Sequence, residues 1–343
     1  MKARIVTGRP PGGERVLLAQ KLPLTTPLLI QFFPIYACNF RCFYCTFSSD
    51  VADRGFISDV VKMDFDLFSK CIEEIACFPQ KVKVIRFVGM GEPLLHDRIA
   101  DMVAYTVTAG VTERVEILTN GSMLTTELAD ALIEAGLHRL LVSIQGTSSE
   151  KYREVCGVAL DFERFVDNLR YYYERTQGQV HIKIIDCALE NERDQVRFYA
   201  LFGDVCDTIG IELAGPIFPN VDYQRVLPGK TKDLTQFGRP RDHVMVCPQP
   251  FFTMQINPDG KVVPCYSVVY PQILGDCNQE RLTEIWDGKK WHSFRLRMLQ
   301  GIEHAGKICS SCNIIRHRFH PEDDLCGVVG SLTAYYHRRL RNS

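Results

Sequence analysis

The chain has 343 residues, with 40 Lys and Arg against 41 Asp and Glu, so its formal net charge is −1. This near-neutral balance argues against general electrostatic attraction to nucleic acid or to an anionic membrane surface. A hydrophobic fraction of 46% and a charged fraction of 24% exclude a disordered chain, and the length predicts a globular protein of roughly two domains.

Residues 1–27 are predicted to form an N-terminal extension. The segment from Met1 to Pro11 is basic and rich in Gly and Pro, without the apolar run of a signal peptide. No apolar run along the chain reaches about 18 residues, so we expect no transmembrane helix. The chain contains 14 cysteines. Without an export signal, these thiols predict a cytoplasmic protein in which Cys residues are free, catalytic or metal-bound.

Short β-branched or aromatic runs alternate with amphipathic segments between residues 29 and 213. The apolar runs predict strands at 29–33, 83–88, 115–118, 140–144, 181–185 and 208–212, and the helical periodicity predicts helices at 64–77, 97–109, 125–136, 161–175 and 192–202. Asp64 and Thr125 are expected to cap two of these helices. Such alternation implies parallel strands joined by right-handed crossovers. Six units are too few for an eight-fold barrel, so we expect a partial (β/α)6 barrel over residues 28–225.

A second, smaller unit is expected over residues 226–320, because Gly and Pro become frequent after residue 215 and the alternation stops. Residues 251–256 and 261–264 flank an Asn-Pro-Asp-Gly turn and predict a hairpin. Residues 282–299 predict one or two helices, and residues 321–343 form a basic C-terminal tail. The predicted fold class is therefore α/β, with a barrel core and a small C-terminal domain.

The first cysteine group, Cys38, Cys42 and Cys45, directly follows the first predicted strand. Three thiolates in one loop can converge on one metal centre, and soft sulfur ligands favour an iron–sulfur cluster or zinc. The same spacing also marks one face of a helix with buried thiols, but no apolar stripe continues from it. Zinc would need a fourth ligand, and the nearest candidates, Cys71 and Cys77, lie in a predicted helix and are expected in the core.

Three cysteines leave one iron of a four-iron cluster without a protein ligand. A C-x3-C-x2-C loop with an aromatic residue before its last Cys, at the end of the first strand, resembles the radical SAM superfamily. The resemblance implies that Cys38, Cys42 and Cys45 bind a [4Fe-4S] cluster whose open iron is chelated by S-adenosylmethionine (SAM), and that Tyr44 packs near the adenine. It also implies that the reduced cluster cleaves SAM to a 5′-deoxyadenosyl radical.

Three more strand ends resemble parts of the family's SAM site. The segment 88–93, Val-Gly-Met-Gly-Glu-Pro, resembles the Gly-Gly-Glu element that receives the SAM amino group, which Glu92 can accept. Segments 119–121 and 143–146 resemble the ribose and carboxylate contacts, although relatives often carry Asp at the position of Gln145. Each segment alone is also a common turn. The cofactor-binding candidates are Tyr44, Gly89, Met90, Gly91, Glu92, Asn120, Ser143 and Gln145.

The second cysteine group consists of Cys247 and Cys265, which bracket the hairpin, and the pair Cys309 and Cys312. A hairpin plus a CxxC segment can form a site of four thiolates, and this spacing is shared by structural zinc ribbons and iron–sulfur sites. Together with the first group, it resembles the SPASM/twitch extension of radical SAM enzymes. The twitch form implies one auxiliary [4Fe-4S] cluster bound by these four Cys, in an auxiliary iron–sulfur domain.

The resemblance leaves several reactions open. The first is oxidation of a carbinol in a small, sugar-like or cyclitol substrate, with an electron passing to the auxiliary cluster, as in twitch-type dehydrogenases. The second is epimerisation with a thiol as hydrogen donor, for which Cys277 and Cys326 are the candidates, and the third is peptide modification. A non-catalytic electron-transfer or metal-scaffold protein is a fourth hypothesis. Asp186 and Glu212, at predicted strand ends, are candidates to bind substrate hydroxyls. A reductant such as flavodoxin or ferredoxin is the expected protein partner.

Overall fold

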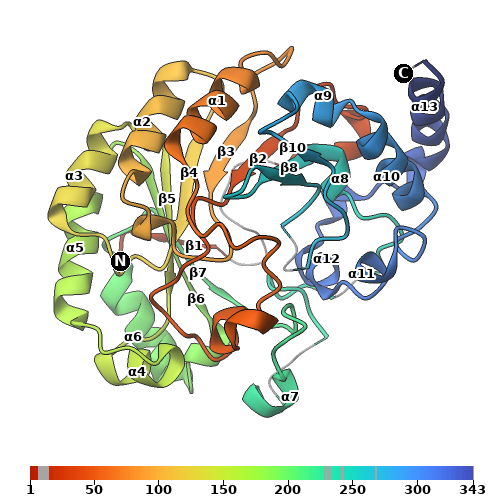
Figure 1. The fold of residues 1–343 in the computed structure, drawn as a ribbon. Coiled ribbons are helices and arrows are strands. Elements are labelled where there is room, and N and C mark those ends of the chain that lie inside the picture. Colours follow the sequence, from red (N-terminus) through yellow and green to blue (C-terminus); the bar gives the residue numbers. More distant parts are fainter. Residues whose placement is uncertain (7–14, 228, 230–232, 241–242, 267–268, 343) are drawn as a thin grey trace.

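The computed structural model describes residues 1–6, 15–227, 229, 233–240, 243–266 and 269–342, and is dominated by one curved sheet (Figure 1). Its strands are β1 (Arg4–Ile5), β2 (Leu29–Phe32), β3 (Val84–Phe87), β4 (Val115–Thr119), β5 (Arg139–Ile144), β6 (Gln179–Ile185), β7 (Thr208–Glu212), β8 (Thr253–Ile256), β9 (Lys261–Val263) and β10 (Gly275–Asp276). The sheet order is β1-β7-β6-β5-β4-β3-β2-β8-β9-β10. Strands β2 to β7 run parallel in chain order, which confirms the predicted partial barrel.

Helices cover the outer face of the barrel and surround the C-terminal hairpin (Figure 1). They are α1 (Phe65–Ile75), α2 (Ile99–Ala109), α3 (Thr126–Glu134), α4 (Ser149–Cys156), α5 (Phe162–Arg175), α6 (Glu192–Phe202), α7 (Tyr223–Val226), α8 (Gln249–Phe252), α9 (Leu282–Trp286), α10 (Lys289–Leu299), α11 (Lys307–Ser310), α12 (Asn313–Arg318) and α13 (Val329–Asn342). Asp64 and Thr125 cap α1 and α3 through their side chains, as predicted. In the described part of the chain, no helix is both long and apolar enough to cross a membrane.

The C-terminal hairpin extends the barrel sheet, which the sequence analysis did not anticipate. Strand β8 pairs in parallel with β2, so that Ile30 lies opposite Met254 and Phe32 opposite Ile256. All four residues of β8 are buried, as expected for a parallel strand covered on both faces. The predicted barrel and the predicted second unit therefore share backbone hydrogen bonds along their first strands.

Among the other elements that were not predicted, three show different physical reasons. Strand β1 is a two-residue edge strand beside β7, too short to give a periodic pattern. Helix α4 occupies a polar segment in which only Tyr152, Val155 and Cys156 are buried. Helix α13 lies in the segment expected to be a basic tail, and it packs against α10 through Tyr336, which is 1% exposed. Its basic residues outnumber its buried ones, which hid its amphipathic pattern.

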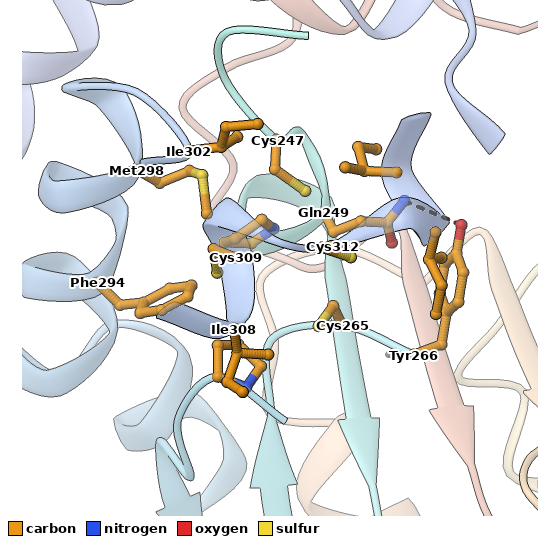
Figure 2. A pocket seen from close by; sticks show the side chains of 14 residues that line it. Cys247, Gln249, Cys265, Tyr266, Phe294, Met298, Ile302, Ile308, Cys309 and Cys312 are labelled. Atoms are coloured by element: carbon orange, nitrogen blue, oxygen red, sulfur yellow. Dashed lines mark hydrogen bonds between the residues drawn. The ribbon is translucent and has the colours of Figure 1, made fainter. Parts of the chain in front are cut away.

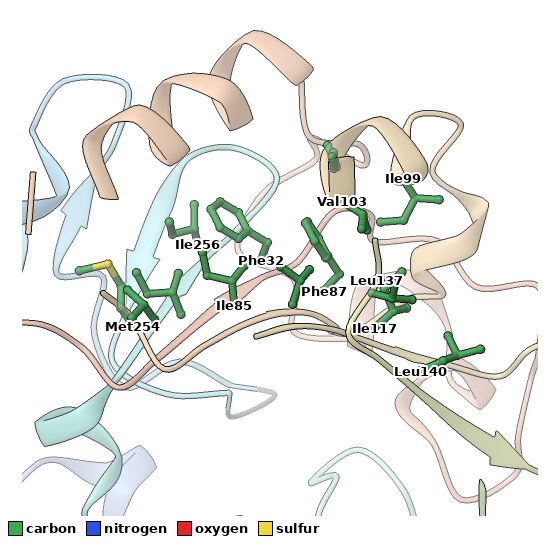
Figure 3. Close-up of a cluster of buried hydrophobic side chains, with 14 of the residues drawn as sticks. Phe32, Ile85, Phe87, Ile99, Val103, Ile117, Leu137, Leu140, Met254 and Ile256 are labelled. Carbon is green, nitrogen blue, oxygen red and sulfur yellow. The ribbon is translucent and has the colours of Figure 1, made fainter. Parts of the chain in front are cut away.

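The main hydrophobic core lies between the sheet and the outer helices (Figure 3). Alternate strand residues point into it: Phe32, Ile85, Phe87, Ile117 and Met254 are all fully buried. Because side chains alternate along a strand, the residues between them face the barrel interior. At an effective 25 cal/mol per Å² of apolar surface, each such side chain contributes about 2 kcal/mol to folding.

The interior of the barrel carries a buried charge cluster. Glu116 of β4 is fully buried, and its carboxylate contacts Arg86 at 2.6 Å, Arg114 at 2.7 Å and Arg139 at 3.2 Å. Burial alone would raise the pKa of Glu116, but the three guanidinium groups hold it below its ordinary value. Glu116 and Arg139 lie at the beginning of β4 and β5, so these contacts tie β3, β4 and β5 together, by charge as well as by backbone pairing, away from the carboxyl ends of the strands.

Candidate active site and auxiliary cysteine pocket

The first cysteine loop leaves the end of β2 and is fixed against the end of α4. Backbone N–H groups of Arg41 and Phe43 donate to the carbonyls of Cys156 and Val155 at 2.9 and 3.0 Å. The Cys42 thiol is buried and forms a hydrogen bond with the thiol of Cys156, which raises its pKa together with burial. Cys156 therefore lies directly beside one of the three predicted ligands.

Cys38 and Cys45 pack against a group that we call the inner apolar cluster: Phe33, Tyr36, Phe47, Met90 and Ile314. Burial raises the pKa of both thiols to about 12. The three thiols of the loop are therefore neutral without a metal, and binding of a metal centre would have to displace their protons. Thiolates in an apolar surrounding are suitable ligands for an iron–sulfur cluster.

The Gly-rich segment after β3 approaches this loop at backbone distance. The backbone N–H of Glu92 donates to the Ala37 carbonyl at 2.8 Å. A Cβ on Gly91 would lie 2.0 Å from the carbonyl oxygen of Ile35, and one on Gly89 would meet the ring of Phe33 at 2.4 Å. Only glycine fits at both positions. Met90, between them, is buried in the inner apolar cluster.

Glu92 is buried, and its carboxylate ties the end of β3 to the end of β4. Oε2 accepts from the backbone N–H of Asn120 at 2.7 Å, and Oε1 accepts from the backbone N–H of Leu94 at 3.0 Å and from the Thr119 hydroxyl. Burial raises the pKa of Glu92 from 4.5 to about 7. Since a carboxylate has about four acceptor positions, one remains for an ammonium group.

The remaining predicted cofactor-binding residues lie at the ends of β4 and β5. Asn120 donates to Asn39 Oδ1 at 3.0 Å, which links it to the cysteine loop. Gln145, at the position where relatives often carry Asp, accepts a hydrogen bond from the Tyr44 hydroxyl. Its side-chain amide donates to the Ser143 carbonyl at 3.2 Å. Gln145 therefore orients Tyr44, and the structure brings together all the strand-end candidates around one opening of the barrel.

A polar cluster lies inside the barrel at the ends of β6 and β7. Lys183 Nζ donates to Glu212 Oε2 at 2.6 Å, and Gln236 Nε2 donates to Glu212 Oε1 at 3.5 Å. Burial alone would raise the pKa of Glu212, but Lys183 holds it below its ordinary value. Gln236 in turn accepts from Arg318 of α12 at 2.7 Å. Asp186, the other acidic candidate, accepts instead from the backbone N–H of Ala214 at 2.7 Å.

The four cysteines of the second group line one pocket between the hairpin and the C-terminal helices (Figure 2). Cys247 precedes α8, Cys265 follows β9, Cys309 lies in α11 and Cys312 precedes α12. The other described residues that line the pocket are Gln249, Pro250, Tyr266, Pro271, Phe294, Met298, Ile302, Ile308, Ile314 and Ile315, without a carboxylate. Four thiols in an apolar pocket fit a metal centre with sulfur ligands.

The comparison with known proteins is consistent with both cysteine groups. The model of the radical SAM superfamily matches residues 32–197, and that of the SPASM iron–sulfur cluster-binding domain matches residues 247–313. The chain is 36% identical over 305 residues to the tungsten-containing aldehyde ferredoxin oxidoreductase cofactor-modifying protein of Pyrococcus furiosus, covering 75% of this chain and 80% of that protein. The chain belongs to the radical SAM superfamily.

A further protein and a solved structure are similar to most of the chain. The S-adenosyl-L-methionine-dependent 2-deoxy-scyllo-inosamine dehydrogenase of Niallia circulans is 23% identical over 282 residues, 80% of this chain and 88% of that protein. The structure of BtrN in complex with AdoMet and 2-DOIA has a TM-score of 0.53 at 20% identity and covers 83% of this chain and 92% of that chain. Radical SAM domains bind SAM and a [4Fe-4S] cluster, and SPASM domains bind auxiliary iron–sulfur clusters.

The two hydrogen-donor candidates of this radical SAM enzyme lie outside the inner apolar cluster, as far as the structure describes the chain. Cys277 is fully buried in the main core, where its sulfur lies 3.5 Å from that of Cys71 and 3.0 Å from the Gly260 carbonyl. Cys326 is exposed just before α13. A thiol that returns hydrogen to a substrate must reach the barrel opening, and the structure does not bring Cys277 there.

Some residues of the radical SAM site carried no readable signal in the sequence. Asn39 binds Asn120, yet it belongs to a polar loop where such residues are common. Thr119, which binds Glu92, ends β4 and belongs to the segment 119–121 that the sequence did indicate. Lys183 was visible as a charge at an inward position of a mostly apolar strand. Cys77, expected in the core, is exposed because α1 ends at Ile75.

Proposed function

We propose that the chain is a radical SAM oxidoreductase that removes a hydrogen atom from a hydroxyl-bearing carbon of a small carbohydrate or cyclitol. The [4Fe-4S] cluster and SAM supply the 5′-deoxyadenosyl radical, and an auxiliary [4Fe-4S] cluster supplies an electron acceptor. The proposed cluster ligands are Cys38, Cys42 and Cys45 for the first and Cys247, Cys265, Cys309 and Cys312 for the second.

The proposed SAM site consists of residues that already contact one another. Tyr44 is held by Gln145, and Glu92 is held by the segment after β4. Gly89 and Gly91 keep the approach free of side chains, Met90 supplies an apolar wall, and Glu92 retains an acceptor for the amino group. Asn120 and Ser143 stand at the ends of β4 and β5, where ribose and carboxylate contacts are expected.

The observation that carries the proposal is that the two cysteine groups share one apolar cluster. Cys38 and Cys45 of the first group and Cys312 of the second all pack against the inner apolar cluster. A second redox centre beside the radical-forming site is of use for a net oxidation, since a substrate radical must lose one electron to become a carbonyl. An epimerase instead needs a thiol that donates hydrogen beside the inner apolar cluster, and neither Cys277 nor Cys326 belongs to that cluster.

The polar cluster inside the barrel supports a hydroxylated substrate. Hydrogen bonds with substrate hydroxyls are available from the charged and amide groups of Lys183, Glu212 and Gln236. Because Lys183 holds the pKa of Glu212 low, Glu212 is ionised and able to accept a hydroxyl proton. The similarity to the 2-deoxy-scyllo-inosamine dehydrogenase agrees with a cyclitol. We expect the protein to act in the cytoplasm with a flavodoxin or ferredoxin as reductant.

A second candidate is the modification of a tungsten-containing cofactor. It is favoured by the identity of 36% to the Pyrococcus furiosus protein, higher than that to the dehydrogenase. The two candidates predict different substrates for the same radical chemistry. A negatively charged substrate would engage Arg318 and Lys183, whereas a neutral cyclitol would engage Glu212 and Gln236.

Anaerobic reconstitution tests the proposal. We expect about eight iron atoms per chain, from two four-iron clusters, and formation of 5′-deoxyadenosine with dithionite and SAM. With a panel of cyclitols and sugars, a dehydrogenase forms one carbonyl product for each 5′-deoxyadenosine. Four iron atoms with one zinc would refute the role of the auxiliary site. Deuterium uptake from D2O into an inverted product would refute the oxidation.

The residues of the substrate cluster offer a matched pair of variants. Glu212→Gln removes the proton acceptor and keeps the size of the side chain, so we expect turnover to fall at least tenfold while iron content stays unchanged. Glu134→Gln makes the same chemical change at an exposed position of α3 and should leave turnover unchanged. Equal turnover of both variants would show that Glu212 does not contact the substrate.

A further inference from the structure

Arg295 of α10 is a positive charge inside the protein, and the residues that the structure describes give it no negative partner. It is 1% exposed. Its Nε donates to the Pro250 carbonyl at 2.9 Å and its Nη1 to the Trp286 carbonyl at 3.2 Å, while Nη2 is buried without a hydrogen-bond partner. Burial lowers the pKa of the guanidinium, and no carboxylate of the described residues acts on it. Asp287, the acid closest in sequence, pairs with Arg339.

Aromatic rings enclose this guanidinium. Its central carbon lies 4.1 Å from the ring centre of Trp286, 5.3 Å from that of Tyr336 and 5.5 Å from that of Trp291. Such contacts stabilise a cation. They do not neutralise it, and a buried charge without a counter-charge destabilises a protein. The surroundings therefore favour a negative group in the neighbourhood.

The pocket of four cysteines adjoins Arg295 and offers a place for such a group. Pro250, whose carbonyl binds Arg295, lines this pocket, and so do Phe294 and Met298 of the same helix. Pro250 thus stands between the guanidinium and the four thiols.

A four-iron cluster on four thiolates would bring the missing charge. Its net charge is about −2 when oxidised and about −3 when reduced, and net charge is among the factors that set its reduction potential. A fixed cation nearby stabilises the reduced form more than the oxidised form, because the reduced form carries the larger negative charge. The low dielectric of the surrounding aromatic core leaves this interaction little screened.

We propose that Arg295 is the buried counter-charge of the auxiliary cluster and raises its reduction potential. It is a positioning residue that acts through the cluster, without contact with the substrate. The inference rests on the proposed binding of a [4Fe-4S] cluster by Cys247, Cys265, Cys309 and Cys312. A higher potential makes this cluster a better acceptor for the electron of the substrate radical.

The test is a potentiometric titration of the auxiliary cluster, followed by electron paramagnetic resonance. The parent protein is the full chain in which Cys38, Cys42 and Cys45 are replaced by Ala, so that only the second site holds iron. Arg295→Met and Arg295→Gln remove the charge, and Arg295→Lys keeps it. Lys290→Met removes the same charge from an exposed position of α10.

We expect the midpoint potential to become more negative in Arg295→Met and Arg295→Gln, and to stay near the parent value in Arg295→Lys and Lys290→Met. Loss of iron from the two neutral variants alone would also support the charge requirement. Unchanged potentials with iron retained would overturn the inference. Loss of iron from all three Arg295 variants would overturn it too, since the role would then be architectural. Absence of iron from the parent protein would instead refute the proposed auxiliary cluster itself.

Discussion

Replacement of Glu92 by Gln tests the electrostatics of the proposed SAM site without any cofactor. Glu92 is 2% exposed, and burial raises its pKa from 4.5 to about 7. Between these two values the native protein binds a proton that the unfolded chain does not. The free energy of unfolding therefore falls as the pH rises through this window: the contribution is fully present below 4.5 and lost above about 7.

The shift from 4.5 to about 7 corresponds to about 3 kcal/mol of unfolding free energy. Because Glu92 is buried, solvent screening does not reduce this value. Gln is neutral at every pH, so the variant lacks this decline. The stability of Glu92→Gln relative to the wild type should therefore rise by about 3 kcal/mol from acidic to mildly alkaline pH. This comparison cancels the titration of every other group.

The assay is urea unfolding of the metal-free protein under anaerobic conditions at several pH values, followed by circular dichroism. Glu134→Gln, at an exposed position of α3, serves as control and should follow the wild type. Parallel pH profiles of Glu92→Gln and the wild type would refute the reasoning. They would mean that the pKa of Glu92 is the same in the native protein as in the unfolded chain, with its hydrogen bonds offsetting the effect of burial.

Three other predictions concern the barrel and the two cysteine groups. Glu116→Gln should destabilise the metal-free protein by about 3–5 kcal/mol in urea unfolding, because it leaves the buried guanidinium group of Arg139 and two partly buried ones without this counter-charge. A loss below about 1 kcal/mol would contradict the charge cluster. Gly91→Ala should abolish SAM binding in equilibrium dialysis, because the Cβ of the new alanine would lie 2.0 Å from the Ile35 carbonyl oxygen. If this variant bound SAM with the affinity of the wild type, the backbone would be able to adjust. Cys265→Ser should lower the iron content from about eight to about four atoms per chain, and retention of all iron would exclude this thiol as a ligand.

Much of the barrel could be predicted from the sequence, because each parallel strand is apolar and bounded by turn residues. Strands β2 to β7 and their helices follow this rule within a few residues. The pairing of β8 with β2 could not be predicted, since strand order between distant segments leaves no local pattern. Helix α4 was missed because its exposed face is strongly charged.

The candidate site likewise contains residues that the sequence indicates and contacts that only the fold reveals. The cysteine spacing and the Gly-rich segment are local patterns and are visible in one sequence. The contacts of Gln145 with Tyr44 and of Cys156 with Cys42 join segments far apart in the chain, and they appear only once the fold is known. Arg295 looks like one more basic residue of a polar helix; only the burial of its guanidinium among aromatic rings sets it apart.

The pairing of β8 with β2 has a consequence during synthesis on the ribosome. The first barrel strand, Leu29–Phe32, is made early, but its partner, Thr253–Ile256, is made after the rest of the barrel. Until then one edge of β2 exposes unpaired N–H and C=O groups, which can pair with other chains. A nascent chain or a fragment that stops before residue 253 keeps this edge open. We therefore expect truncated barrels to aggregate and to depend on chaperones, whereas the complete chain closes its own edge.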